Sequence, residues 1–99
     1  MFGLIGKFRA QPGKRDALAA ILLGSTGAMP GCLSYIVAND AEDPDGIWIS
    51  EVWTDEKSHK ASLELPEVKA AIAEAMPLIA GFDSHVKTVP LGGVGLPSV

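Results

Sequence analysis

The chain alternates between segments in which hydrophobic residues have strand-like spacing and segments in which they have helical spacing. Strands are predicted at 2–10, 32–39, 47–53 and 85–89. Helices are predicted at 14–23, from Thr54 or Asp55 to about 63, and from Pro66 to a stop at Gly81. This β-α-β-β-α-β order, with the last helical region divided before Pro66, predicts an α+β fold: a ferredoxin-like, four-stranded antiparallel sheet with helices on one face.

The strand predicted at 47–53 carries bulky groups on both faces. Side chains alternate along a strand. One face therefore holds Ile47, Ile49, Glu51 and Trp53, and the other holds Trp48, Ser50 and Val52. Helices cover only one face of such a sheet, so the second apolar face predicts another covering layer. A second copy packed sheet to sheet supplies it, and we expect a homodimer that closes a dimeric α+β barrel.

Composition supports a single domain with an additional buried surface. Of the 99 residues, 47% are hydrophobic and 20% charged, which is apolar for a domain of this size and indicates a subunit interface or an apolar cavity. We expect residues 1–89 to form the domain. The apolar, glycine-rich tail 90–99 is expected to pack on the partner subunit.

Charge, cysteine content and hydropathy exclude several classes of function. The formal charge of −4 provides no basic surface for nucleic acid. The single cysteine, Cys32, excludes an internal disulfide and favours a cytoplasmic location. The sequence contains no secretory leader and no apolar run of the length that spans a membrane, so we expect neither export nor membrane insertion.

No arrangement of residues predicts a metal or a nucleotide cofactor. The acidic turn 40–46 lacks the ligand positions of a calcium loop, and the two histidines, 26 residues apart, have no clustered partner for zinc. The glycines at 92–95 open no helix and so do not form a dinucleotide-binding loop. Cys32 has no basic neighbour in sequence and is interpreted as an inert thiol.

The candidate chemistry centres on Glu51 and Trp53, a carboxylate and an indole on one face of an apolar strand. Glu51 is either a surface or ion-paired carboxylate, or a half-buried base with a raised pKa. Trp53 is either a core aromatic or the wall of a pocket. His59 is either a solvated helix residue or a general base suited to neutral pH. His85, in the last strand, is interpreted as structural.

Three further polar residues are candidate ligand contacts. Tyr35 and Ser50 could donate hydrogen bonds to a ligand oxygen, although the preferred interpretation of Tyr35 is a buried core tyrosine. Ser62 shares the helical side of His59.

Several motifs resemble the antibiotic biosynthesis monooxygenase superfamily, in particular its small quinol-monooxygenase-like members. They are the run Glu51-Val52-Trp53-Thr54-Asp55-Glu56, the pairs Ser62-Leu63 and Leu65-Pro66 with Glu67-Val68, the strand start Gly31-Cys32-Leu33-Ser34-Tyr35, and the hairpin Asp43-Pro44-Asp45. The resemblance implies a dimeric α+β barrel with a pocket between sheet and helices in each subunit. It also implies oxidation of phenols or quinols by O₂ without metal or flavin, with the tryptophan implicated.

The chain departs from the family's patterns at several places. Members that oxidise aromatic polyketides have asparagine where this chain has Ile49 and tyrosine where it has His59. Small quinol-monooxygenase-like members have histidines at the places of Ser62 and Glu67. The haem-degrading branch needs a histidine where Leu63 stands, which disfavours haem chemistry.

The family resemblance, together with the Glu51 and Trp53 pair, predicts a cofactor-independent monooxygenase that oxidises a small aromatic quinol or phenol with O₂ to a quinone. His59 or Glu51 would be the base, Trp53 the stacking wall, and Tyr35, Ser50 and Ser62 the substrate contacts. The alternative is a dimeric protein that binds an aromatic or hydrophobic ligand without changing it.

Overall fold

The computed structural model describes residues 1–24 and 29–96. Its four strands form one antiparallel sheet in the order β2-β3-β1-β4. Their bounds are β1 Phe2–Ala10, β2 Cys32–Asn39, β3 Gly46–Trp53 and β4 Ile79–Thr88. This is the ferredoxin-like arrangement that the sequence predicts, and the first two predicted strands have the observed bounds.

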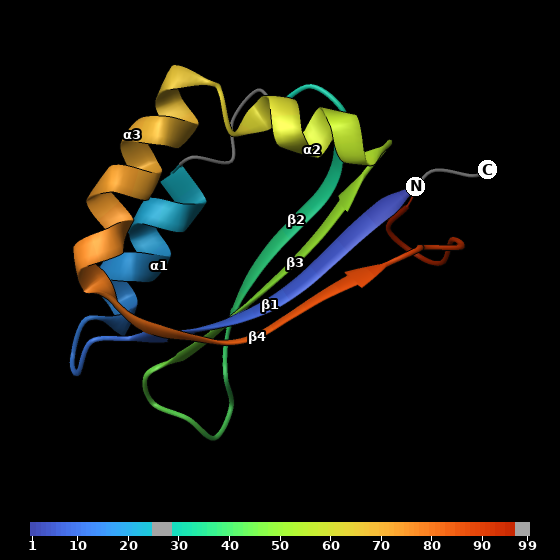
Figure 1. Ribbon diagram of the computed structural model, residues 1–99. Coiled ribbons are helices and arrows are strands. Elements are labelled where there is room, and N and C mark those ends of the chain that lie inside the picture. The colour runs from blue at the N-terminus through green and yellow to red at the C-terminus, as the bar shows by residue number, and fades with distance from the viewer. Residues whose placement is uncertain (25–28, 97–99) are drawn as a thin grey trace.

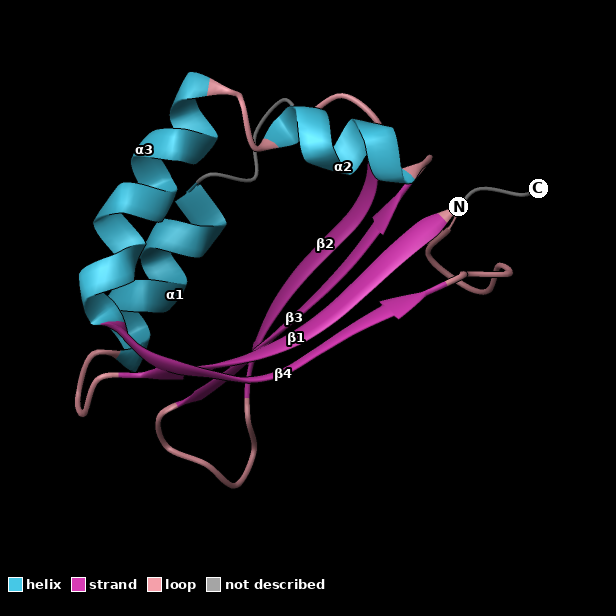
Figure 2. Ribbon diagram, viewed as in Figure 1, coloured by secondary structure: helices cyan, strands magenta, loops and turns pink. Residues whose placement is uncertain are grey.

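Three helices lie on one face of the sheet, which curves beneath them (Figure 1). They are α1 Arg15–Gly24, α2 Glu56–Ser62 and α3 Pro66–Ala75, followed by a 3-10 helix at Met76–Leu78. Figure 2 shows α1 and α3 side by side over one end of the sheet and α2 over the other. The core lies beneath α1 and α3, where Leu18 and Ala75 pack on Ala10, Ile47 and Ile49.

Local sequence fixes the ends of α2 and α3. Asp55 caps α2, because its carboxylate accepts a hydrogen bond from the backbone N–H of Ser58 at 2.7 Å. Pro66 occupies the first turn of α3, where a missing N–H costs nothing. The chain therefore turns at Leu65–Pro66. It leaves α2, over one end of the sheet, and enters α3, which lies beside α1.

The last strand begins earlier than predicted. We expected the helix to run to Gly81 and the strand to begin at His85, but β4 starts at Ile79. Pro77 ends the helical hydrogen bonding, and Ile79 pairs with Ala10 through an irregular stretch with two register shifts. The prediction that the helix continues past Ile79 to Gly81 was therefore wrong.

A register shift between Cys32 and Ser34 changes the predicted faces of β2. Strict alternation places Cys32 opposite Tyr35, but Cys32 pairs with Trp53, and Tyr35 pairs with Glu51. The bulge therefore brings Cys32 to the same face as Tyr35. Burial raises the pKa of the Cys32 thiol, which agrees with an inert side chain.

The face of the sheet away from the helices is partly apolar and uncovered in the single chain. Ile5, Ile36 and Val86 on this face are 39%, 57% and 49% exposed. Val89 and Leu91, which lead into the tail, are also exposed. Among residues 1–24 and 29–96, no helix has the length and hydrophobicity needed to cross a bilayer.

Candidate active site

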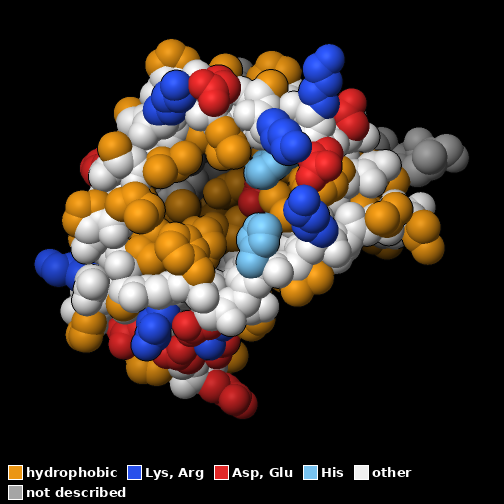
Figure 3. All heavy atoms as spheres, in the orientation of Figure 1, with side chains coloured by type: hydrophobic (Ala, Val, Ile, Leu, Met, Phe, Trp, Pro, Cys, Tyr) orange, Lys and Arg blue, Asp and Glu red, His pale blue; other side chains and the backbone are white. Residues whose placement is uncertain are grey.

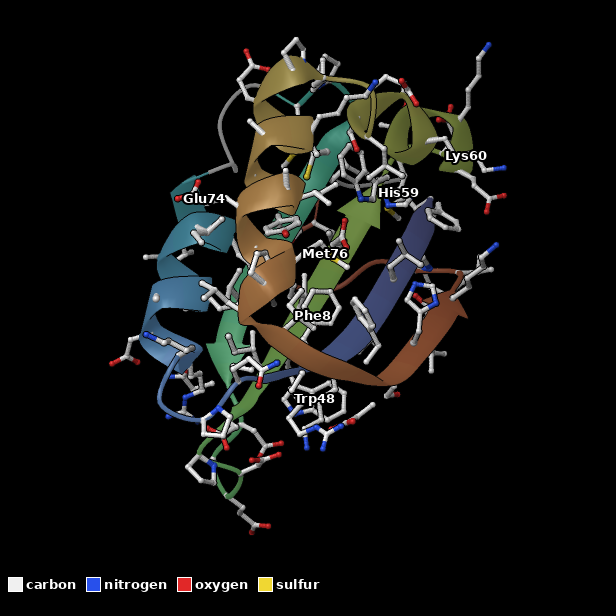
Figure 4. All side chains as sticks on the ribbon, turned by 60° about the vertical axis from the view of Figure 1, so that its left-hand side comes forward. Phe8, Trp48, His59, Lys60, Glu74 and Met76 are labelled. Atoms are coloured by element: carbon white, nitrogen blue, oxygen red, sulfur yellow. The ribbon has the colours of Figure 1, made fainter. Side chains whose placement is uncertain are left out.

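A cavity of about 320 Å³ lies between the sheet and the helices. Figure 3 looks into it: hydrophobic side chains line the hollow, and the two histidines of the chain lie along its edge. Figure 4 shows Phe8 on the sheet and Met76 at the end of α3 directed into the space between these layers. Among the described lining, the side chains with nitrogen or oxygen atoms are Tyr35, Glu51, Trp53, His59, Ser62 and His85.

Glu51 and Trp53 form the polar pair that the sequence predicts. They lie two residues apart on the same face of β3, and the indole Nε1–H donates a hydrogen bond to Oε1 of Glu51 at 3.1 Å. Trp53 is only 1% exposed. A ligand in the cavity therefore meets the carboxylate more readily than the indole face, and the indole holds the carboxylate in place.

The surroundings of Glu51 raise its affinity for a proton above that of an ordinary carboxylate. Burial raises the pKa of Glu51, and the Trp53 hydrogen bond and the nearby charges of His59 and His85 offset only part of that effect. A carboxylate with a raised pKa holds a proton more strongly once it has taken one. The structure thus places a half-buried carboxylate in an apolar cavity.

His59 projects from α2 toward the sheet, while the adjacent Lys60 points outward (Figure 4). The His59 imidazole packs between two aromatic rings, with its centroid 5.5 Å from that of Trp53 and 5.7 Å from that of Phe2. This partly buried packing fixes the ring at the cavity wall close to Glu51. His59 therefore belongs to the site geometrically.

Tyr35 lies on β2 directly across from Glu51 on β3. Burial, together with the negative charge of Glu51, raises the pKa of Tyr35 to about 12. The phenol therefore keeps its proton throughout the physiological pH range. It can donate a hydrogen bond to an anionic ligand oxygen, but it cannot act as the base.

Ser62 lines the cavity, whereas Ser50 does not. Ser62 is buried at the cavity wall, and its hydroxyl donates to the backbone carbonyl of His59 at 2.6 Å. Ser50 lies on the opposite face of β3, where it pairs with Ile5 and Ile36, and it does not line the cavity. The expectation that Ser50 contacts substrate fails because the alternation that brings Glu51 and Trp53 inward turns Ser50 outward.

His85, which was interpreted from the sequence as structural, lines the cavity. It lies on β4 opposite Gly6 of β1, and its side chain lines the cavity. Its position depends on the register between β1 and β4, which includes a shift between Lys7 and Phe8. Lys87, two residues on and on the same face, forms an ion pair with Glu56 of α2 at 2.9 Å, which is consistent with this placement.

The acidic turn between β2 and β3 is a structural feature. Asp40 accepts hydrogen bonds from the backbone N–H groups of Glu42 and Asp43 and from the indole of Trp48 on the outer face, and these bonds hold its pKa well below the usual range. Lys7 pairs with Asp43 at 3.1 Å. Within the described part of the chain, no cluster of three histidine, cysteine or acidic residues has the arrangement of a metal site.

Comparison with known proteins agrees with this architecture. Residues 1–74 match the family model described as Antibiotic biosynthesis monooxygenase. A solved structure from Chloroflexus aurantiacus J-10-fl, provisionally named an antibiotic biosynthesis monooxygenase, is 61% identical, with a TM-score of 0.94 over 97% of this chain and 98% of that one. The chain belongs to the antibiotic biosynthesis monooxygenase family. Its fold is accordingly that of the dimeric α+β barrel proteins.

More distant structures share the fold of this family member. PA3566 from Pseudomonas aeruginosa is 21% identical, with a TM-score of 0.80 over 92% of this chain and 94% of that one. Rv0793 from Mycobacterium tuberculosis is 22% identical, with a TM-score of 0.78 over 94% and 97% of the two chains. No curated protein matches significantly. At these identities the two structures establish the fold alone.

Proposed function

We propose that this protein is a cofactor-independent monooxygenase that oxidises a small aromatic phenol or quinol with O₂ to a quinone. The observation that carries the proposal is Glu51, a carboxylate with a raised pKa inside an apolar cavity, facing a tyrosine that stays protonated. The first group can remove a phenolic proton, and the second can stabilise the anion that results. Membership of the monooxygenase family supports the same reaction class.

The substrate supplies the electrons in this reaction. Glu51 takes the phenolic proton, and the phenolate transfers one electron to O₂. The two radicals combine at a ring carbon to give a peroxide anion, which takes the proton back from Glu51. Loss of the proton on that carbon breaks the O–O bond, releases water and leaves a carbonyl. In balance, a phenol with a free ring C–H and O₂ yield a quinone and water.

Each remaining polar residue has a defined part in the proposal. The Trp53 indole positions Glu51 through the 3.1 Å hydrogen bond. Tyr35 donates to the phenolate oxygen, while His59, packed on Trp53, contributes positive charge when protonated. Ser62, whose proton is used by the His59 carbonyl, can only accept from the substrate. The apolar walls exclude water, which protects the anion and the radicals from side reactions.

We also propose that the protein works as a homodimer. The outer face of the sheet exposes Ile5, Ile36 and Val86, and a second copy packed on this face would cover them. Val89 and Leu91, at the start of the apolar tail, are exposed, which supports packing of the tail on that second copy. We retain the proposals of a cytoplasmic location and of a tail that packs on the partner.

Oxygen uptake by chelator-treated protein tests the catalytic proposal. With one- and two-ring phenols and hydroquinols, we expect uptake above the autoxidation blank, and Glu51→Gln should lower kcat by about 100-fold or more. His59→Gln is the matched comparison: if it abolishes turnover while Glu51→Gln does not, His59 is the base. Tight binding of these phenols with no oxygen uptake would favour the ligand-binding alternative.

A further inference from the structure

His85 occupies a place in the cavity that the proposed reaction has not yet used. It comes from β4, on the other side of β1 from Glu51, and its imidazole lines the cavity. In the sheet register, Glu51 lies opposite Leu4, and His85 lies opposite Gly6 on the same strand. The two groups therefore flank β1 and share the face that looks toward the helices.

Gly6 allows the imidazole to lie low over the sheet. A Cβ atom added at Gly6 would be 3.9 Å from Cδ2 of His85 and 3.7 Å from Cε1 of Phe8, so both rings lie close to the bare backbone of β1. These are ordinary contact distances, and a side chain of one carbon would fit. At Gly3, by contrast, a Cβ would collide with Thr88 and Pro90. Crowding by neighbouring atoms therefore explains why Gly3 lacks a side chain. It does not explain why Gly6 lacks one.

A glycine inside a strand weakens the strand, and such a position often marks close approach of a ligand to the backbone. Gly6 is part of the cavity lining. Its missing side chain opens the floor of the cavity between Ile49 on β3 and His85 on β4. A flat ring can therefore lie over β1 at this point.

The register also gives the distance between the backbone positions of Glu51 and His85. Glu51 and His85 are separated by two strand spacings of roughly 4.8 Å and by two residues of roughly 3.4 Å along the strand, so their Cα atoms lie roughly 12 Å apart. Both side chains line the cavity, Glu51 half-buried within it and His85 exposed at its edge, so a ring bound between them can meet one polar group at each end. On the same strand, Lys87 forms an ion pair with Glu56 of α2.

We propose that His85 binds the substrate oxygen para to the one held by Glu51 and Tyr35, so that the site selects 1,4-dioxygenated aromatics. This inference rests on the proposed aromatic substrate and names the geometry of its class. A para-quinol or para-quinone has oxygens at both ends of the ring, whereas an ortho isomer has both at one end. His85 is then a substrate-contacting residue that specifies where the second oxygen lies.

The size of the cavity selects the probes for the test. An engineered protein cavity of roughly 150 Å³ holds one benzene ring, so the cavity of about 320 Å³ has room for two fused rings. Calorimetry under strictly anaerobic conditions would compare 1,4-dihydroxynaphthalene, 1,2-dihydroxynaphthalene and 1-naphthol. Without O₂ the comparison reports binding alone, which separates this inference from the oxygenase proposal.

We expect the 1,4-diol to bind about tenfold more tightly than 1-naphthol, because one additional hydrogen bond forms, and the 1,2-diol to show no such gain. His85→Phe should remove the gain, so that the 1,4-diol binds this variant no more tightly than 1-naphthol does. Ser84→Ala, on the opposite face of β4, should change nothing. Equal affinity of the wild-type protein for all three ligands, binding of none of them, or a gain that survives in His85→Phe would overturn the proposal, even if oxygen uptake is observed.

Discussion

At the scale of single residues, the burial that favours the proposed role of Glu51 as a base also makes its charge unfavourable for the fold. The pKa of Glu51 is raised because the ionised form is poorly solvated. The folded protein therefore binds a proton at Glu51 more strongly than the unfolded chain does. Stability falls as pH rises from the ordinary carboxyl range through the folded pKa, and the penalty is complete above that pKa.

Replacing Glu51 with Gln should therefore stabilise the protein at neutral pH while it abolishes activity. Gln keeps an oxygen that can accept the Trp53 hydrogen bond but carries no charge. We expect the melting temperature of Glu51→Gln to exceed that of the wild type at pH 7 to 8 and the two to converge as the pH falls below the ordinary carboxyl pKa of about 4.3, where Glu51 becomes protonated in both states.

Thermal denaturation across this pH range provides the measurement. Glu74→Gln is the matched control, because Glu74 is exposed and lies away from the cavity (Figure 4). It should not reproduce the neutral-pH gain. A Glu51→Gln variant that is less stable than the wild type at pH 7 would show that the carboxylate is favourably solvated, which contradicts the account of the base.

Residue types and strand alternation were enough to predict Glu51 and Trp53 on one face. The same alternation already turned Ser50 away, so the expectation that it contacts substrate overlooked information in the sequence. His85 could not be placed in the same way. Its face depends on pairing across the irregular β1–β4 ladder, and a one-residue shift reverses the face of every side chain that follows.

At the scale of elements, α2 is the helix that carries polar residues of the site. It is seven residues long, and its inner side supplies His59 and Ser62 to the cavity wall. A helix this short is marginal without capping and packing. The hydrogen bond from the Ser58 N–H to Asp55 is thus expected to matter for the placement of both residues.

Asp55→Ala should lower stability by about 1 kcal/mol, which corresponds to a drop in melting temperature of roughly 4–8 °C for a domain of this size. It should also weaken binding of 1-naphthol, because the start of α2 frays and the His59 ring is less well held. Urea denaturation and calorimetry measure the two effects. Asp55→Ser retains a capping oxygen and should recover most of both; equal losses in the two variants would contradict a capping role.

Strand bounds were predictable where turn residues flank an apolar run, as at β1 and β2. The start of β4 was not, because Ile79 continues the helical spacing of α3 and only Pro77 signals the change. The bulge at Cys32 likewise has no sequence signal that alternation could detect. Irregular pairing is set by the tertiary fit of neighbouring strands, so sequence periodicity fails at these points.

At the scale of the whole molecule, one face of the sheet carries the cavity, and the other exposes apolar side chains that the proposed second copy would cover. Ile36, 57% exposed near the middle of β2, is the largest apolar contribution of that strand to the outer face. We expect light scattering to show a dimer for the wild type and a shift toward monomer for Ile36→Lys, because a buried, unpaired ammonium is costly at an apolar interface.

Ala73→Lys is the matched control for that experiment. Ala73 is exposed on α3, on the helical side of the molecule, and the same side chain there should leave the dimer intact. A wild-type protein that is monomeric at all concentrations would show that the outer face meets water. In that case the barrel proposed for this chain would be wrong, although the cavity within each subunit would stand.

The central claim is that the cavity directs one atom of O₂ into an aromatic substrate, and isotope labelling tests it most directly. Chelator-treated protein would oxidise 1-naphthol under ¹⁸O₂, followed by rapid reduction and acetylation of the product and mass spectrometry. A parallel reaction with unlabelled O₂ in ¹⁸O-water corrects for carbonyl exchange. The account predicts one ¹⁸O atom in each 1,4-naphthoquinone formed and none in the product of Glu51→Gln above the blank. A product without label, or labelling that is equal with and without the protein, would contradict it.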